Sequence, residues 1–226
     1  MCGRFTSLLS PELITAIREL FGVPVPDSVE PRYNIAPSQQ VWVVRQEGDH
    51  NRFDLMKWGL IPSWAKDPKI GSKMINARSE TVQEKPSFRH AIKFRRCIIP
   101  AAGFYEWMHT GDKKQPYYIR MADGSPMLLA GLWEQWKRLG EQNLLETFTI
   151  LTTEANDLVA PLHDRMPVIL RTNDCNLWLS HSMHNPEQLQ GMYQPFPSNL
   201  LEAYKVSDLV NNPRNDSPDL LSQLPT

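Results

Sequence analysis

Cys2 is the residue whose position in this sequence suggests chemistry most directly. It follows the initiator methionine and precedes Gly3, and an initiator methionine is usually removed when the second residue is small. Removal would leave a free α-amine of pKa about 7.7–8.0 beside a thiol of pKa about 8.5. Such a 1,2-aminothiol converts an aldehyde into an imine and then, by intramolecular attack of sulfur, into a five-membered thiazolidine. The alternative is an incidental cysteine at the second position.

Three further side chains could move protons or hold an amine. Glu106 lies in Gly-Phe-Tyr-Glu-Trp, where strand alternation places it on the same face as Phe104 and opposite its two aromatic neighbours. A carboxylate in such surroundings can have a raised pKa and carry protons. His163 can exchange a proton near neutral pH, and Asn76 could position an amine. The alternatives are a surface glutamate on a half-exposed strand, a structural histidine and an asparagine without a special role.

Charge is balanced over the whole chain but is concentrated locally. The 226 residues carry a formal net charge of -1, so nucleic-acid binding would have to use a local patch. The segment 66–96 holds nine Lys or Arg and three acidic residues, a net charge of +6. Its Arg78, together with Arg4, could hold phosphates. The alternative is a solvated basic face.

Tryptophans near this basic segment offer flat faces on which unpaired bases can stack, namely Trp58, Trp64 and Trp107. Seven tryptophans in one chain mostly indicate core packing, however. We assign three of them to the core: Trp58, Trp133 and Trp136.

The cysteine pattern and the hydropathy exclude several classes of protein. Cys2, Cys97 and Cys175 are far apart and odd in number, which argues against a disulfide framework and a structural zinc site. His181 and His184 lie in a polar stretch without a metal-ligand pattern. The N-terminus is too short and too polar for a signal peptide, and no apolar run approaches the ~20 residues of a membrane span. We expect a cytoplasmic protein in a reducing compartment, with no membrane association and no obligate protein partner.

The elements that position these residues are predicted to be short, because proline (19) outnumbers glycine (11). Ser10-Pro11-Glu12 begins a helix that ends at Gly22. Further short helices are expected at 86–94, 154–159 and 172–179. Strands are expected at 41–45, 53–58, 96–99, 104–108, 117–120, 127–133, 147–152 and 167–170. Residues 2–6 are expected to be extended, and a hairpin turn is expected at Gly48-Asp49. Loops are expected at 23–37 and 61–73.

Many short strands with irregular connections predict an α+β fold. We expect one domain over residues 1–226, with a mainly antiparallel, barrel-like sheet flanked by short helices and no linker that divides the chain. The tail after Glu202 is rich in Asn, Asp, Pro and Ser. Its last residues, from about 215, are therefore expected to be loosely held.

Six ordered blocks of the sequence resemble the SOS-response-associated peptidase family, whose members process abasic sites. They are Met-Cys-Gly-Arg-Phe at 1–5, Arg-Tyr-Asn-Ile-Ala-Pro at 32–37, Trp-Gly-Leu-Ile-Pro-Ser-Trp at 58–64, Ile-Asn-Ala-Arg-Ser-Glu-Thr at 75–81, Cys-Ile-Ile-Pro-Ala-Ala-Gly-Phe-Tyr-Glu-Trp at 97–107 and His-Asp-Arg-Met-Pro-Val-Ile-Leu at 163–170. Val-Asn-Asn at 210–212 is a weaker match. The resemblance spans nearly the whole chain and is weak from 171 to 201.

The resemblance implies a bifurcated, barrel-like sheet and covalent attachment to the ring-opened aldehyde of an abasic site in single-stranded DNA. It implies that Cys2 attacks, that Asn76 holds its amine, that Glu106 moves protons and that His163 assists at the sugar oxygen. It also implies a DNA path, with Arg4 and Arg78 on backbone phosphates and with Pro37, Trp64, Trp107 and Thr152 beside the strand. This chemistry needs no metal and no organic cofactor, and the protein on damaged DNA would be associated with the nucleoid.

Two other functions use the same residues. The family name suggests an N-terminal-nucleophile cysteine peptidase, a hydrolase in which Cys2 attacks with His163 and Glu106 as base and orienter. Its minimal activity is removal of Met1 from its own chain, which would also expose the amine that the DNA trap requires. A non-catalytic nucleic-acid module would instead use the basic segment and the tryptophans, and its binding would be reversed by salt. The trap is the hypothesis that uses most of the candidate residues together, with lyase-type chemistry as a possible extension.

Overall fold

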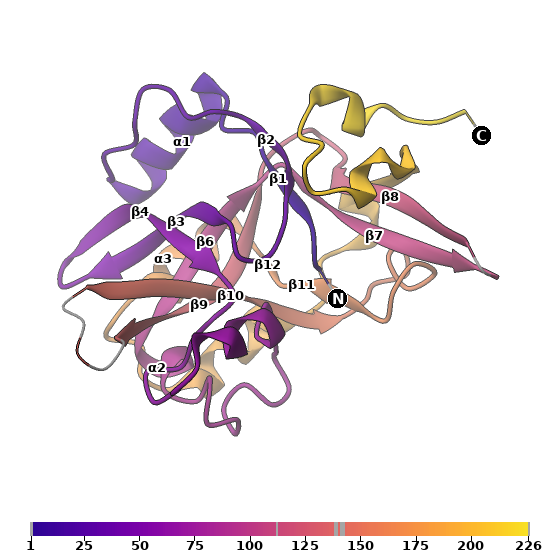
Figure 1. Cartoon of the computed structure of the whole chain (residues 1–226). Coiled ribbons are helices and arrows are strands. Elements are labelled where there is room, and N and C mark those ends of the chain that lie inside the picture. The colour runs from indigo at the N-terminus through magenta and orange to yellow at the C-terminus, as the bar shows by residue number, and fades with distance from the viewer. Residues whose placement is uncertain (1, 112, 138–139, 141–142, 226) are drawn as a thin grey trace.

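A computed structural model describes residues 2–111, 113–137, 140 and 143–225 of the chain (Figure 1). Within these residues the chain forms thirteen strands, three α-helices and six 3₁₀ helices. Met1, whose removal the aminothiol chemistry requires, lies outside the described residues. The fold is therefore described from Cys2 onward.

The first of two sheets has five strands in the order β13-β8-β7-β1-β2. Its strands are β1 (Phe5–Ser7), β2 (Arg32–Ile35), β7 (Gly103–Thr110), β8 (Lys113–Met121) and β13 (Leu201–Lys205). Every pairing in this sheet is antiparallel. Phe5 of β1 lies opposite Phe104 of β7, so the start of the chain is paired with the strand that carries Glu106.

The second sheet closes on itself and then branches. Its order is β11-β10-β4-β3-β6-β9-β12, with β5 beside β10, and an additional β10–β9 pairing closes five strands into a barrel. Its strands are β3 (Gln40–Glu47), β4 (His50–Trp58), β5 (Asn76–Arg78), β6 (Arg96–Ala101), β9 (Met127–Lys137), β10 (Leu144–Glu154), β11 (Arg165–Pro167) and β12 (Ile169–Leu170). Beyond Ile150, β10 continues beside β5 and β11 instead of β9. The expected α+β fold with a bifurcated, mainly antiparallel, barrel-like sheet is confirmed.

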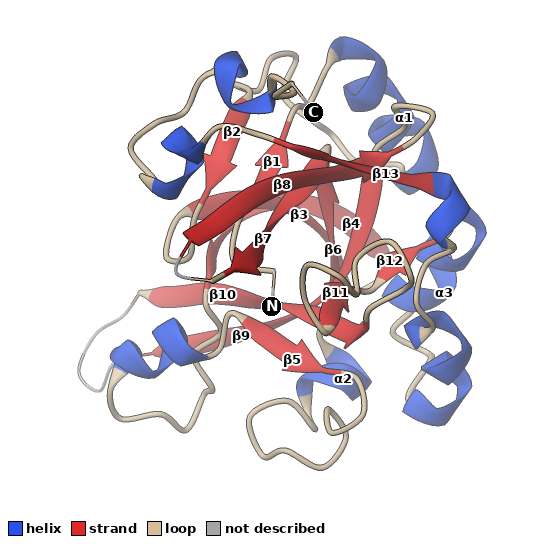
Figure 2. Ribbon diagram, turned by 90° about the vertical axis from the view of Figure 1, so that its right-hand side faces the viewer, coloured by secondary structure: helices blue, strands red, loops and turns tan. Residues whose placement is uncertain are grey.

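Short helices flank the sheets (Figure 2). The α-helices are α1 (Pro11–Phe21), α2 (Ala91–Phe94) and α3 (Cys175–Leu179). The 3₁₀ helices are Pro68–Lys73, Thr172–Asp174, Pro186–Tyr193, Ser198–Leu200, Asp208–Asn211 and Pro218–Leu221. The ends of α1 are those that the sequence predicts: the Ser10 side chain accepts from the N–H of Leu13, and Gly22 ends the helix at φ 62°. Among the described residues, no helix has the length and apolarity needed to cross a bilayer.

The apolar core is divided by the barrel sheet. Along β10, Phe148 and Ile150 belong to one buried cluster, whereas Leu151 belongs to another that also contains the buried face of α1. The cluster around Phe148 includes Cys2 and Phe104 and so joins the two sheets. The core assignment of three tryptophans is confirmed, with exposed fractions of 1% for Trp58, 6% for Trp133 and 6% for Trp136.

The predicted hairpin at Gly48-Asp49 is confirmed, since Glu47 pairs with His50 across a turn in which Gly48 has φ 58°. The helix expected at 154–159 is wrong. Strand β10 runs through Glu154, and residues 157–162 form turns. Strand pairing explains the difference, because Glu154 pairs with Arg165 of β11 and extends β10 into the expected helix.

Other elements differ in extent from the expectation. The helix expected at 86–94 is helical only over Ala91–Phe94, and the strand expected at 167–170 is divided between β11 and β12. Strands β2, β5 and β13 were not expected. Each is at most five residues long and follows a polar or proline-rich stretch, so its pattern alone does not separate it from a loop.

The C-terminal tail is packed instead of loosely held through the residues described. Leu220 is 1% exposed in a cluster with Tyr105 and Tyr118. The N–H of Leu224 donates to the carbonyl of Lys205 at 2.9 Å. The composition of the tail therefore reflects capped 3₁₀ turns and not an absence of contacts.

A close crossing of two backbones at Gly59 and Gly71 sets the loop that carries Trp64. A Cβ built on Gly71 would lie 2.7 Å from the carbonyl oxygen of Gly59 and 3.0 Å from Cγ1 of Ile61. Both neighbours are buried parts of the fold, so they have little room to yield. The loop keeps its position only with glycine at 71.

The substitution Gly71→Ala is expected to lower the free energy of unfolding by about 1–3 kcal/mol, as overpacking does. Denaturant unfolding measures the change. Gly191→Ala is the matched control, because a Cβ there meets no atom within 4 Å, and its effect should stay within about 0.5 kcal/mol. Equal stability of the two variants would contradict the importance of this crossing.

Candidate active site

The start of the described chain lies near the centre of the molecule in both views, not at its periphery (Figures 1 and 2). Cys2 is fully buried in the cluster that joins the two sheets. Asn76, the first residue of β5, donates from Nδ2 to the carbonyl oxygen of Cys2 at 2.9 Å. Asn76 is itself placed by pairing with Ile150 of β10. The branch of the second sheet therefore fixes the first residue that the aminothiol chemistry needs.

Burial controls the acidity of the Cys2 thiol. Its removal from water raises the thiol pKa far above the usual range, and the negative charge of Glu106 raises it further. The thiol is therefore protonated at neutral pH. A group in that state is a poor nucleophile in a first step, because the thiolate is the reactive form.

Glu106 lies on the face of β7 that points to the same cluster. Its strand neighbour Tyr105 packs in a different cluster, with Trp107 against it, whereas Phe104 belongs to the cluster of Cys2. Glu106 is 3% exposed. Burial raises its pKa to about 7, and the charge of Asp164 contributes to the rise. At neutral pH this carboxyl group can therefore either give or take a proton.

His163 stands at the end of the turns that precede β11. Its Nδ1 lies 3.0 Å from the backbone nitrogen of Arg165 and 2.7 Å from Oδ1 of Asp164. Nδ1 cannot at the same time accept a hydrogen bond from the Arg165 N–H and donate one to the Asp164 carboxylate. The Arg165 N–H needs a protein acceptor, whereas the Asp164 side chain is 75% exposed and has water, and burial lowers the pKa of His163. We therefore assign the neutral tautomer with the proton on Nε2.

An ion pair that the sequence did not reveal holds this region together. Arg165 donates to both carboxylate oxygens of Glu80, at 2.7 and 2.9 Å, and to the carbonyl oxygen of Thr152 at 2.7 Å. It joins the block at 75–81 to the block at 163–170. A bidentate guanidinium contact fixes orientation as well as distance. It therefore holds the segment that carries Asn76 in a fixed position relative to the segment that carries His163. The one sequence signal was the presence of both residues in the family blocks.

The predicted DNA-path residues fall into separate groups. Arg78 is exposed at the end of β5 and pairs in register with Thr152, which is buried and donates to the carbonyl oxygen of Ala77 at 3.4 Å. Pro37 is partly exposed, directly before Ser38, whose φ is 74°. Arg78 and Thr152 belong to the branch of the barrel, whereas Pro37 lies in a turn in which the N–H of Ser38 donates to the carbonyl of Trp58 at the end of β4.

Trp64 is the most exposed large hydrophobic residue among those described, at 59%. It lines a pocket of about 320 Å³ together with three lysines and one acidic residue, Lys66, Lys69, Lys73 and Asp67. An exposed ring among lysines is the combination that stacking on single-stranded nucleic acid uses. Trp107 and Arg4 are not in this group and contact the C-terminal segment instead.

The basic segment 66–96 contributes fewer surface charges than its composition suggests. Arg96 is 2% exposed and donates to backbone carbonyls in and around α2 and α3. Arg95 forms an ion pair with Glu134. The remaining seven basic residues are exposed: Lys66, Lys69, Lys73, Arg78, Lys85, Arg89 and Lys93.

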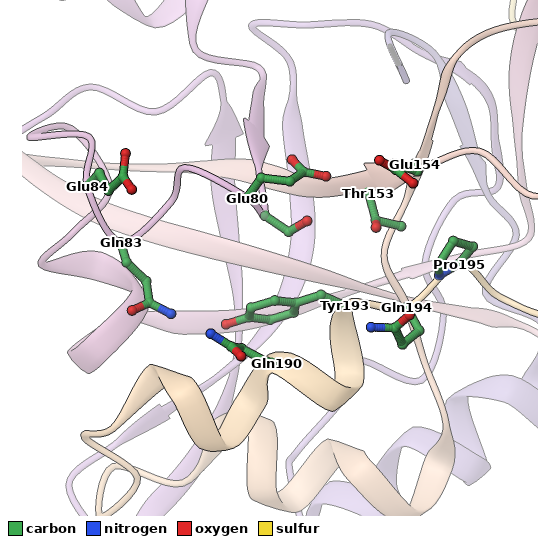
Figure 3. Close-up of a pocket in the computed structure, with 10 residues that line it drawn as sticks. Glu80, Gln83, Glu84, Thr153, Glu154, Gln190, Tyr193, Gln194 and Pro195 are labelled. Carbon is green, nitrogen blue, oxygen red and sulfur yellow. The ribbon is translucent and has the colours of Figure 1, made fainter.

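Two larger pockets contain none of the candidate catalytic residues. Figure 3 shows the first, of about 490 Å³, whose lining includes Glu80, Glu84, Thr153, Glu154 and Tyr193. Of its three carboxylates, that of Glu80 is paired with Arg165. The second, of about 690 Å³, lies between α1 and the strands β9 and β12 and is mainly apolar. In the described part of the chain, no three His, Cys, Asp or Glu side chains are placed to share a metal ion.

Comparisons with known proteins agree with this architecture. The family model described as SOS response associated peptidase (SRAP) matches residues 1–213. The chain is 47% identical over 225 residues to the abasic site processing protein YoqW of Bacillus subtilis, covering 98% of this chain and 99% of YoqW. It is 43% identical over 222 residues to the abasic site processing protein YoaM of the same organism, covering 98% and 97%. The crystal structure of a protein from Bacteroides thetaiotaomicron is similar, with a TM-score of 0.86 and 28% identity over 99% of this chain and 100% of the other. By sequence, this chain belongs to the SOS response associated peptidase family.

Proposed function

We propose that this protein attaches covalently to abasic sites in single-stranded DNA through Cys2, once Met1 has been removed. The observation that carries the proposal is the setting of Cys2, which is buried, held at its carbonyl by Asn76 and within electrostatic range of Glu106. The names of YoqW and YoaM describe abasic site processing, which supports the general function. The chemistry at Cys2 is inferred from the residues.

The first step uses the amine of Cys2. Oδ1 of Asn76 is buried and has no hydrogen-bond partner among the described residues, so it can accept a hydrogen bond from the freed amine. With a pKa of about 7, Glu106 can take a proton from the ammonium, whose reference pKa is about 7.7–8.0. The neutral amine then attacks the aldehyde carbon C1′. Glu106 returns the proton to the hydroxyl group, which leaves as water and gives the protonated imine. Glu106 then takes up the proton on nitrogen and leaves the neutral imine.

The second step uses the thiol. Sulfur adds to the imine carbon, and the S–H proton passes to the nitrogen, so a C–S bond forms while the C=N bond becomes single. The sum of both steps is aminothiol plus aldehyde giving thiazolidine plus water, with no change of oxidation state. Because the thiol is protonated at rest, the amine acts before the sulfur. Ring closure is intramolecular and has the high effective concentration of such reactions.

His163 assists before either step. An abasic sugar is mostly a closed hemiacetal, and opening it requires a proton on the ring oxygen. The neutral imidazole assigned above can donate a hydrogen bond from Nε2–H to the ring oxygen. As the ring C–O bond breaks, the anomeric hydroxyl loses its proton to become the aldehyde oxygen and the ring oxygen gains one. Arg78 and the lysines beside Trp64 would bind the backbone on either side, with the indole face under an unpaired base.

The peptidase alternative uses Cys2 differently. A cysteine peptidase attacks with a thiolate, whose pKa is lowered by a neighbouring cation. Here burial and the charge of Glu106 raise the pKa of the Cys2 thiol, and burial lowers that of His163. These shifts favour a neutral thiol and a neutral imidazole. The trap is therefore the better supported function, and removal of Met1 is the one peptidase step that remains compatible with it.

The substitution Cys2→Ala is expected to abolish the adduct that survives denaturing electrophoresis, to below about 1% of wild type, because the sulfur supplies the ring closure. The amine remains, so an imine that borohydride traps should still form. Cys175→Ala is the matched control, since Cys175 is also buried but lies in α3, and it should cross-link like wild type. Undiminished stable adduct with Cys2→Ala would refute the proposal.

The rate of cross-linking is expected to show a bell-shaped pH dependence. It rises as the ammonium of Cys2 loses its proton and falls as Glu106, with a pKa of about 7, loses the proton that it must donate to the leaving hydroxyl. Glu106→Gln should lower the maximum by about 10²–10⁴-fold and remove the alkaline limb. Single-turnover rates from pH 5 to 9 measure both effects. A Glu106→Gln profile with an unchanged alkaline limb would assign that limb to another group.

The state of residue 1 decides between self-processing and processing by the host. Intact mass spectrometry of wild type, Cys2→Ala and Glu106→Gln, each produced in a host lacking other aminopeptidase activity, measures it. Under the peptidase hypothesis both variants should retain Met1 while wild type loses it. Normal loss of Met1 in both variants would remove the support for self-processing and leave the DNA trap intact.

A further inference from the structure

Arg4 is a partly buried cation without a carboxylate partner among the described residues. Its Nη1 donates to Oδ1 of Asn34 at 2.6 Å and to the carbonyl oxygen of Val210 at 2.7 Å. Its Nε is buried and has no hydrogen-bond partner in the described part of the chain. Burial lowers the pKa of Arg4. A guanidinium oriented by neutral acceptors retains its full charge for an anion that comes from outside the protein.

Asn34 connects Arg4 to the C-terminal segment 208–216, which we call the clamp. Asn34 is 0% exposed. Its Nδ2 donates to three clamp carbonyls, those of Val210, Asn212 and Asn215, at 3.2, 3.0 and 2.7 Å. Three carbonyl acceptors settle the orientation of the amide, because only its nitrogen can donate. Oδ1 is therefore directed to Arg4, and one buried side chain joins β2, the start of β1 and the clamp.

The clamp also holds Trp107. The indole Nε1 donates to Oδ1 of Asn211 at 2.7 Å, and the ring packs against the cluster that contains Val210. At the other end of the clamp, Asp216 accepts from the backbone N–H of Tyr33 and from Nε of Arg32. Both ends of the segment are thus attached to the five-stranded sheet. Arg4 and Trp107, two of the predicted DNA-path residues, therefore share a single support.

We propose that the clamp positions Arg4 and Trp107 for the DNA backbone and an unpaired base, with Asn34 and Asn211 as positioning residues. This inference rests on the proposed function and adds a device to it. Arg4 follows Cys2 by two residues, which span at most about 7 Å of chain. A phosphate bound by Arg4 would therefore lie close to the sugar that Cys2 attacks. Under this proposal, the sequence blocks at 32–37 and 210–212 share the role of positioning Arg4 and Trp107. The catalytic chemistry had given these blocks no role.

The test separates positioning from chemistry by using intact single-stranded DNA, which cannot react with Cys2. Anisotropy titrations over a range of salt give the affinity and the salt slope, which falls by about 0.7 for each lost phosphate contact on a single strand. Arg4→Ala should lower the slope by that amount. Asn34→Asp, which places an acceptor against three carbonyls, should lower it equally, and the double variant should show no further loss.

Asn211→Ala tests the contact of the clamp with Trp107. It is less disruptive to folding than Asn34→Asp, because the hydrogen bond between Asn211 and Trp107 is at the surface. We expect affinity to fall several-fold, as loss of a well-held stacking ring does. With abasic DNA, the half-saturating concentration should rise more than the maximal cross-linking rate falls. Asn185→Ala is the matched control, since the Asn185 side chain caps the 3₁₀ helix Pro186–Tyr193 outside this region. It should bind DNA like wild type.

Several outcomes would overturn the proposal. One is an Asn34→Asp variant that is less stable yet keeps the wild-type salt slope; another is an Asn211→Ala variant with wild-type affinity. If Asn34→Asp does not fold, Arg4→Ala and Asn211→Ala still decide the question. Stable cross-linking by Cys2→Ala would instead overturn the proposed function. Loss of cross-linking in Cys2→Ala together with unchanged binding in the clamp variants would overturn the clamp alone.

Discussion

The hydrogen bond from Asn76 to the carbonyl of Cys2 is the contact on which the rest of the site depends. A chain terminus normally lies in water and moves freely. Here Cys2 is tied to the branch of the barrel by Asn76 and is buried in the cluster that joins the two sheets. That burial removes water from the thiol and from Glu106 and raises both pKa values. The fixed position of Cys2, the exclusion of water from its thiol and from Glu106, and the raised pKa values of both groups therefore have one structural cause.

The branching of β10 is what makes this arrangement possible. A closed barrel leaves no free edge, but β10 runs past the barrel and receives β5 on one side and β11 on the other. β5 carries Asn76, and β11 follows His163. The bidentate contact of Arg165 with Glu80 then fixes the segments of β5 and β11 relative to each other. The catalytic candidates thus come from segments far apart in sequence that share one strand.

Local signals predicted the elements with local causes. The cap at Ser10, the turn at Gly48 and the alternation around Glu106 each depend on neighbours in sequence, and each is found as expected. Strands β2 and β5 depend on partners far away in the chain and have too few residues for a pattern. The helix expected at 154–159 failed because Glu154 belongs to β10 and pairs with the distant strand β11. The position of Cys2 was visible from the sequence, but Asn34 and Arg165 act through contacts that only the fold creates.

A buried thiol that stays protonated and a buried carboxyl group with a pKa of about 7 impose an order on the proposed chemistry. The amine is the group that becomes nucleophilic near neutral pH, so the imine precedes the carbon–sulfur bond. A thiolate would instead react with other electrophiles and with oxidants, since reactivity follows thiolate character and exposure. Keeping the sulfur protonated until an imine lies beside it restricts its reaction to the intended carbon. The burial that makes Cys2 a poor peptidase nucleophile is therefore the property that suits it to a covalent trap.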